Sequence, residues 1–173
     1  MTQRTYASPI GELHLIAESG RLVGLRFGSP GDPAGHNPRE ADTGSGVPEA
    51  DRRVLDAAVR QLGEYFTSRR KAFRLPIALR GTPFQLRVWS ELAKVPFGQT
   101  ISYRQLAERV GNPGASRAVG SANGANALAL IVPCHRVIAA DGTLAGFAGG
   151  VAVKRALLEH ERAGAGLFAL ACG

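Results

Sequence analysis

The sequence predicts two domains: an α/β domain with a small antiparallel sheet and one helix, and a mostly α-helical domain that contains a helix-turn-helix. Three observations predict this division. Short apolar runs between turn residues extend to Phe27, the apolar period becomes helical from Glu49, and Gly81-Thr82-Pro83 begins a series of capped helices. We therefore predict domains at residues 1–80 and 81–173.

The first domain is predicted to begin with a three-stranded meander. Turn signals at residues 8–11 and 18–20 separate three apolar or alternating runs. Residues 28–48 are rich in Gly, Pro and Asp, which predicts a mobile loop. Apolar residues at helical spacing predict an amphipathic helix over Glu49–Thr67, and a short strand near Phe73–Leu79 is expected to close the sheet. Because this part holds no cluster of chemical groups, we interpret it as a scaffold.

The first and last helices of the second domain have clear boundaries in the sequence. Thr82 can cap a helix that has Pro83 at its first position, and an apolar stripe follows as far as the break at Pro96-Phe97-Gly98. A last amphipathic helix is predicted over Val151–Ala163.

Between them, two helices joined by a tight turn predict a helix-turn-helix. Ser102 caps a helix over Tyr103–Val110, Gly111–Gly114 forms the turn, and a short helix covers residues 115–123. This second helix would be the one that reads DNA. Apart from Arg117 it carries only short side chains, which suits a narrow groove. A helix that simply packs tightly inside its own protein has the same composition.

Composition limits the cell compartment and the partners. No apolar run approaches the roughly 20 residues that cross a bilayer, and the N-terminus lacks the apolar core of a signal peptide, so we expect a cytoplasmic protein. The net charge is +7, and arginine supplies 18 of the 21 basic residues. This excess fits binding to a polyanion, although arginine-rich codon usage explains it equally well. The two cysteines, Cys134 and Cys172, form no disulfide scaffold or CxxC metal site, which favours a free thiol at Cys134.

The surroundings of Cys134 suggest chemistry. A lone cysteine is more often a small core residue than a nucleophile. Here Pro133 fixes the backbone before the cysteine, and His135 and Arg136 directly after it can both favour the thiolate. A glycine-rich loop follows, over residues 142–150, and allows the backbone to approach a ligand closely.

His135 cannot easily bond the thiol directly. Neighbouring side chains in an extended segment point to opposite faces, so a bridging water would have to connect Cys134 with the imidazole. A carboxylate behind the imidazole would hold its tautomer, and Glu159 and Glu161 in the last helix are both candidates. A cysteine-hydrolase mechanism is one interpretation of this pair.

The segment Pro133-Cys134-His135-Arg136-Val137 resembles the active-site motif of the O6-alkylguanine-DNA alkyltransferases, the methylated-DNA–protein-cysteine methyltransferases. Segments similar to that family continue in the family's order over residues 82–162: TPFQLRVW, PFGQTISYRQLA, GNPGASRAVGSANGAN, IVPCHRVI, LAGFAGG and AVKRALLEHE. The N-terminal TYASPIGEL is also similar. The resemblance implies a ribonuclease H-like first domain and a winged-helix-like second domain.

The resemblance also implies catalytic roles. Cys134 would attack the alkyl carbon on guanine O6 in one displacement. His135 would be the water-linked base, and Glu161 would orient it. Asn126 would brace the turn that carries the cysteine, and Tyr103 would donate to the guanine as its charge develops.

Contacts with DNA follow from the same resemblance. Arg117 would enter the base stack in place of the extruded nucleotide, and Tyr103 would press on the DNA backbone. Arg104, Asn112 and Ala140 lie where the family touches DNA.

The substrate pocket is expected around Val137, Phe147, Ala148 and Asn123. The chain departs from the family's pattern at three places. Phe147 stands where tyrosine is usual, which removes a hydroxyl but keeps a ring that can stack on the base. Ala148 lacks the side-chain hydroxyl of some members, and Ala127 replaces a common proline, which loosens that turn.

We expect no cofactor and no metal. Some members bind zinc in the N-terminal half, but that half contains no cysteine, and His14 and His36 are too few ligands. The expected partner is double-stranded DNA with an alkylated guanine, bound through the minor groove by a monomer. The target base would have to leave the duplex, because its O6 is buried there.

Three functions are therefore compared. The first is DNA repair by a single irreversible transfer of the alkyl group from O6-alkylguanine, and less so from O4-alkylthymine, to Cys134. The second is a damage sensor that binds the lesion without transfer, which the presence of Cys134 argues against. The third is a cysteine hydrolase, for which no oxyanion-hole signature is evident in the sequence.

Overall fold

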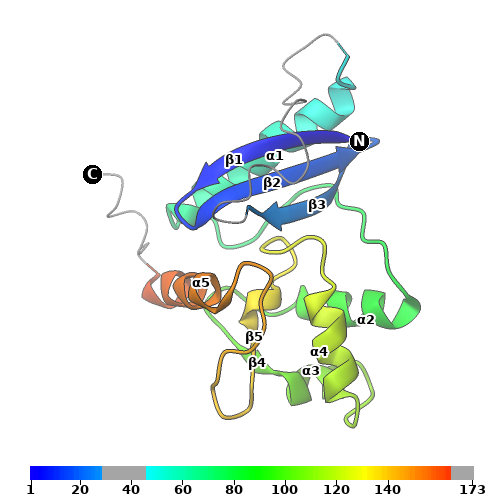
Figure 1. Cartoon of the computed structure of the whole chain (residues 1–173), viewed down its shortest axis with the longest axis vertical. Coiled ribbons are helices and arrows are strands. Elements are labelled where there is room, and N and C mark those ends of the chain that lie inside the picture. The colour runs from blue at the N-terminus through cyan, green and yellow to red at the C-terminus, as the bar shows by residue number, and fades with distance from the viewer. Residues whose placement is uncertain (29–45, 165–173) are drawn as a thin grey trace.

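The computed structural model describes residues 1–28 and 46–164 of the chain. Figure 1 shows two parts, with the sheet and the long helix α1 (Glu49–Phe66) above a group of shorter helices. Most of the loop that we predicted over residues 28–48 lies outside the described residues, as does Cys172. No helix among the described residues is long and apolar enough to cross a membrane.

The predicted three-stranded meander is confirmed. Strands β1 (Thr2–Ser8), β2 (Gly11–Glu18) and β3 (Arg21–Phe27) form an antiparallel sheet in the order β1-β2-β3. The tight turn between β2 and β3 has two residues with positive φ, Ser19 at 52° and Gly20 at 73°. Such φ values suit the mirror-image turns that connect neighbouring antiparallel strands.

Helix α1 covers one face of this sheet, as its amphipathic sequence predicts. The inward side chains of β2 alternate, so that Leu13 and Leu15 are fully buried, and they meet Leu55 and Leu62 from the helix. The predicted end at Thr67 agrees with the structure, where Thr67 is the residue that caps α1. Burial of these apolar faces holds the helix on the sheet.

The strand predicted near Phe73–Leu79 is wrong in extent. The segment forms a single parallel bridge between Ile77 and Leu22 of β3. Two backbone hydrogen bonds flank it, from Leu22 N to Pro76 O at 2.8 Å and from Ala78 N to Leu22 O at 3.0 Å. Pro76 has no N–H to extend the ladder, so pairing stops after one residue.

The predicted helices of the second part are also present. They are α2 (Pro83–Leu92), α3 (Tyr103–Arg109), α4 (Ser116–Gly124) and α5 (Val151–Ala163). Helix α2 ends four residues before Pro96, because the chain turns through residues 93–95 before it reaches the proline.

Capping boxes fix the starts of α2 and α3. The hydroxyl of Thr82 accepts from the backbone of Gln85 at 3.2 Å, and Ser102 accepts from Gln105 at 3.1 Å. In both helices the glutamine side chain returns a bond to the cap backbone. These reciprocal bonds satisfy two of the free N–H groups at each helix start.

One short sheet was not predicted. Strands β4 (Ile101–Ser102) and β5 (Val137–Ile138) pair in parallel, and one 3₁₀ turn over Cys134–Arg136 precedes β5. This pairing places the cysteine segment beside the start of α3. Two-residue strands carry no alternating pattern, so the sequence gives no signal for them.

The two parts share one apolar core. It contains Leu25 from the sheet, Trp89 from α2 and Leu157 from α5. Across the junction, Leu25 N donates to Ala127 O at 2.8 Å, and Leu25 forms a parallel bridge with Leu128. The first part is therefore packed directly behind the segment that carries Cys134.

Candidate active site around Cys134

An asparagine holds the turn that leads to Cys134. Asn126 Nδ2 donates to Val132 O at 2.8 Å, and its Oδ1 accepts from Leu128 N at 3.0 Å. Leu130 adopts a left-handed conformation with φ 69° inside the loop that Asn126 closes. The Cys134 side chain that follows is a free thiol, and the residue is only 4% exposed.

The neighbouring side chains gather around the carboxylate of Glu161. His135 Nε2 lies 2.7 Å from Oε1, and Arg136 bonds both carboxylate oxygens at 2.9 Å. The hydroxyl of Tyr65 donates to Oε1 at 2.7 Å, and Gly98 N donates to Oε2 at 3.1 Å. Buried charges are stable only when they are paired and hydrogen-bonded in this way.

This arrangement determines the tautomer of His135. An ionised carboxylate only accepts hydrogen bonds, so the imidazole proton resides on Nε2, which faces Glu161. Nδ1 then keeps its lone pair. It is buried and has no hydrogen-bond partner among the described residues. The free nitrogen can accept a proton, either directly or through a water molecule.

Burial keeps His135 neutral, and the positive charges near it act in the same direction. Burial on its own would raise the pKa of Glu161, but its hydrogen bond with His135 and the hydrogen bonds and charge of Arg136 hold it well below its usual range. Burial lowers the pKa of His135, and its bond to Glu161 offsets only part of this because Arg136 and Lys154 repel the proton. A neutral imidazole beside an ionised carboxylate is the state that a general base requires.

Cys134 is held mainly as the thiol. Burial raises its pKa, while a hydrogen bond from Asn126 and the charge of Lys154 limit the rise. A nucleophilic attack by this sulfur therefore needs a group that takes its proton.

Lys154 lies beneath the site. It is fully buried, its Nζ donates to Ala145 O at 3.0 Å, and it lies 5.9 Å from the ring centroid of Tyr103. Burial lowers the pKa of Lys154, and the Cys134 thiolate would raise it. Burial raises the pKa of Tyr103, and a Cys134 thiolate would raise it further, so the Tyr103 hydroxyl keeps its proton and can donate.

A cavity of about 590 Å³ opens beside these groups. Its walls come from Tyr103 at the start of α3, from Arg117, Gly120 and Gly124 on α4, and from the loop over residues 145–148. A methyl group on Gly120 would lie 3.8 Å from the Tyr103 ring, so the small residues of α4 leave this space open. Its volume is in the range of small-molecule sites.

Two of the four predicted pocket residues line this cavity. They are Phe147 and Ala148. Val137 does not line it, because its backbone pairs with Ile101 in β5 and its side chain is fully buried in the core. Asn123 is 4% exposed and does not line it either, since its Nδ2 turns inward and donates to Cys134 O at 3.3 Å.

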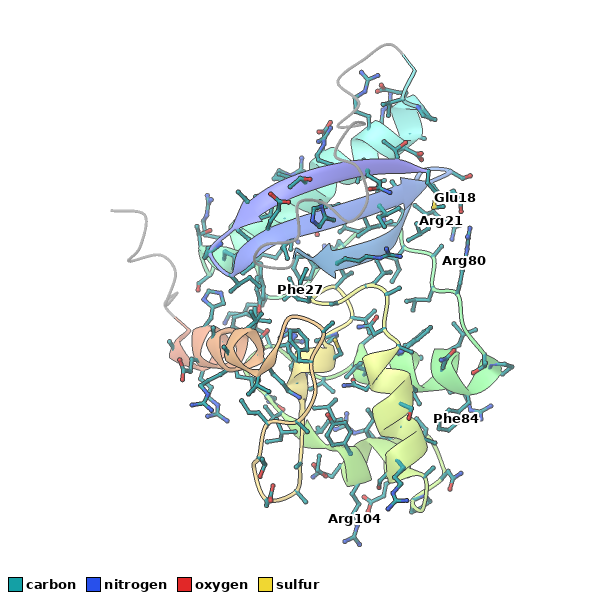
Figure 2. All side chains as sticks on the ribbon, viewed as in Figure 1. Glu18, Arg21, Phe27, Arg80, Phe84 and Arg104 are labelled. Carbon is teal, nitrogen blue, oxygen red and sulfur yellow. The ribbon has the colours of Figure 1, made fainter. Side chains whose placement is uncertain are left out.

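Four of the five residues predicted to contact DNA are exposed, and the fifth, Tyr103, is half-buried at the cavity wall. Arg117, Asn112 and Ala140 are exposed. Arg104 is also exposed and projects from α3 at the end of the molecule remote from the sheet (Figure 2). Its Nε lies 3.3 Å from the carboxylate of Glu108, one turn along the same helix. An exposed pair of this kind is weak and can exchange its partner for a phosphate.

Sequence reasoning missed three residues of the site. Lys154 carried a usable signal, because it occupies the same helix face as Leu157 and Glu161 at spacings of three and four residues. Arg136 was noted only as a neighbour of the thiol, and its bonds to Glu161 depend on the fold. Tyr65 is 96 residues from Glu161 and carried no local signal.

No group of three or more His, Cys, Asp or Glu side chains suited to a metal ion occurs within the described residues. The four predicted members of the thiol site, Cys134, His135, Glu161 and Asn126, are brought together by protein contacts alone.

Family models match nearly the whole chain. The model described as "6-O-methylguanine DNA methyltransferase, ribonuclease-like domain" matches residues 1–79. The model described as "6-O-methylguanine DNA methyltransferase, DNA binding domain" matches residues 83–163.

Similar proteins agree with these matches. A methylated-DNA–protein-cysteine methyltransferase of Mycobacterium tuberculosis is 44% identical over 92% of this chain and 91% of its own length. The constitutive enzyme of that name from Bacillus subtilis is 41% identical over 91% of this chain and 93% of its own. A crystal structure of Mycobacterium tuberculosis OGT in complex with DNA has a TM-score of 0.80 and 41% identity, and the match covers 97% of each chain.

Proposed function

The chain belongs to the methylated-DNA–protein-cysteine methyltransferase family, and from this membership we propose that it repairs DNA by transferring an alkyl group from guanine O6 to Cys134. The observation that carries this proposal is the buried Cys134 thiol beside the His135–Glu161 pair, next to a cavity large enough for a base. The fold supports it, with a ribonuclease-like first domain and a helical DNA-binding domain, which we divide at residues 80 and 81.

The transfer is one displacement at the alkyl carbon. A bond forms between that carbon and Cys134 Sγ, while the bond from the carbon to guanine O6 breaks and leaves its electron pair on the base. The thiol proton passes through a bridging water to His135 Nδ1, which is free to accept it. Tyr103 donates to the guanine as negative charge develops there.

The product explains why each molecule acts once. A thioether has no good leaving group, so the sulfur is not regenerated under the conditions of the reaction. The protein is therefore a reagent that is consumed by its substrate, with one molecule used for each lesion.

Entry of the base requires that it leave the helix. Extrusion costs a few kcal/mol of stacking and pairing. Arg117 lies at the cavity wall on exposed α4 and can fill the gap in the stack. The short side chains of α4 allow close approach to the minor groove, where inserted side chains open base steps. We propose a monomer that acts on duplex DNA in the cytoplasm without a cofactor.

The direct test is intact-mass analysis after mixing with an oligonucleotide that contains O6-methylguanine. We expect one methyl group on the peptide that carries Cys134, no second addition with excess substrate, and no uptake by Cys134→Ser. Cys172→Ser is the matched control, since it removes the other thiol and should react normally. Lesion binding without a mass change would show a damage sensor instead, and repeated ester turnover would show a hydrolase.

A further inference from the structure

One wall of the substrate cavity is held in place from the other domain. Phe147 lines the cavity, and its ring meets the ring of Phe27 edge-on, with centroids 5.2 Å apart and planes at 61°. Phe27 is the last residue of β3 and does not line the cavity itself. Figure 2 shows Phe27 at the end of β3 that faces the loop before α5.

A second contact brings the same loop against Phe27. A methyl group on Gly149 would lie 3.0 Å from Phe27 Cδ1 and 3.1 Å from Val153 Cγ1. The loop backbone therefore packs closely on the Phe27 ring, and a side chain at position 149 would require the ring or the loop to shift by a few tenths of an ångström. The loop is also closed by a bond from Gly150 N to Phe147 O at 2.9 Å.

The polar anchor of the loop is at its other end. Ala145 O accepts from Lys154 Nζ at 3.0 Å, and this bond fixes the start of the wall. The Phe147 side chain has no polar group, so its position depends on packing alone. It lies between Phe27 on one side and the ring of His135 on the other, the latter at 6.4 Å between centroids.

We propose that Phe27 is a specificity-determining residue that sets the width of the alkyl pocket by supporting Phe147, an inference that rests on the proposed function. We expect a bulky O6 substituent, such as benzyl, to be accommodated better when Phe147 can retreat from the cavity. Phe27 occupies the space into which it would retreat. A close-packed contact of this kind yields only when the atoms behind it are removed.

The test compares two lesions in the same oligonucleotide, O6-methylguanine and O6-benzylguanine, so that DNA binding cancels in the ratio of their rates. Alkyl uptake is followed by intact mass. We expect Phe27→Ala to raise the benzyl-to-methyl rate ratio about tenfold, which corresponds to about 1.4 kcal/mol. Phe27→Leu should raise this ratio less. The leucine variant also allows the test to be made if the alanine variant does not fold.

Gly149→Ala provides a change of opposite sign. Its new methyl group is inserted between the loop and Phe27, so the wall should move toward the cavity and the ratio should fall. Combining Gly149→Ala with Phe27→Ala should return the ratio toward that of the unchanged protein. Phe84→Leu is the matched control, because Phe84 on α2 does not line the cavity and its replacement should leave the ratio unchanged.

The outcomes separate this inference from the proposed function. Equal loss of both rates in Phe27→Ala and Phe27→Leu, with an unchanged ratio, would overturn the role of Phe27 while transfer itself stands. If the unchanged protein takes up neither group, the proposed function fails first.

Discussion

At Glu161, one ionised carboxylate accepts hydrogen bonds from four residues in three separate segments of the chain. Tyr65 comes from α1, Gly98 from the loop before β4, and His135 and Arg136 from the 3₁₀ turn. Arg136 balances the carboxylate charge and repels a second proton on the imidazole. Glu161 thus orients His135 and favours its protonation, while burial and the charge of Arg136 keep the imidazole neutral.

Tyr65→Phe tests how finely this balance is set. Removing one donor makes the carboxylate more basic, which raises the pKa of His135 and moves the acid limb of the rate–pH profile to higher pH. The loss of transfer rate should grow as the pH falls below about 6.5 and should be almost absent near pH 8. The measurement is the single-turnover rate of methyl uptake across this range.

Phe73→Leu is the control for Tyr65→Phe. The Phe73 ring packs on Tyr65 with centroids 5.5 Å apart, and Phe73 makes none of the hydrogen bonds to Glu161 described above. It should lower stability without moving the acid limb. An identical shift in both variants would show that packing, and not the lost hydroxyl, causes the effect.

Residues inside the local motif could be predicted, and those outside it could not. Cys134 and His135 are adjacent, and Glu161 lies in a helix whose inward face is visible in the sequence. Tyr65 reaches the same carboxylate only after α1 has packed against the second part. Val137 remains a predicted pocket residue, and the structure shows it buried in the core, paired in a strand that was not predicted.

At the scale of elements, α4 combines exposure with small side chains. Its outer residues include Arg117, Ala118, Ser121 and Gly124, which are all exposed. Trp89 Nε1 donates to Ala122 O at 2.8 Å and holds the inner side of the helix to α2. A helix fixed from behind, with only one long side chain in front, can enter a groove as a rigid body.

Arg117→Ala should separate base extrusion from chemistry. We expect repair of a duplex oligonucleotide to slow at least tenfold. Without the Arg117 side chain in the gap left by the extruded nucleotide, the complex loses a stacking interaction of about 1–3 kcal/mol. Reaction with free O6-benzylguanine should change less than twofold, since no duplex has to be opened.

Arg155→Ala is the control for Arg117→Ala, because it removes the same charge from an exposed position on α5. It should affect the two substrates alike. Equal losses for both substrates in Arg117→Ala would contradict the role of this arginine in the stack.

Elements with local signals were predicted closely. The helix starts at Thr82 and Ser102 follow from capping boxes, which lie within four residues of sequence. Pairing between distant segments carries no such signal, so the contact of β4 with β5 was missed. The segment around Ile77 was assigned too long a strand because apolar content alone does not show where a ladder ends.

At the scale of the whole molecule, the buried cluster makes stability depend on pH. Burial lowers the pKa of His135 from an ordinary value near 6.5. Just below that pH, the imidazole is therefore protonated in the unfolded chain but neutral in the folded protein. Stability should therefore fall as the pH drops below about 6.5. Glu161, with its depressed pKa, adds to this loss below about pH 4.5, because its contribution is present above that value and is lost on protonation.

His135→Gln should flatten this dependence. Between pH 7 and pH 5 the slope of the unfolding free energy should decrease by up to about 1.4 kcal/mol per pH unit, measured by urea denaturation at each pH. His14→Gln, a change on the sheet far from the cluster in sequence, is the matched substitution for comparison. A slope unaltered by His135→Gln would mean that this imidazole titrates alike in both states.

The burial of Cys134 protects its thiol from side reactions before the protein binds a lesion. A reagent that can be spent once is wasted by any stray electrophile or oxidant that reaches its sulfur. A side chain that is only 4% exposed and is kept protonated by its surroundings should react slowly with such compounds. Burial therefore preserves the reactive thiol of each molecule until a damaged base enters the site.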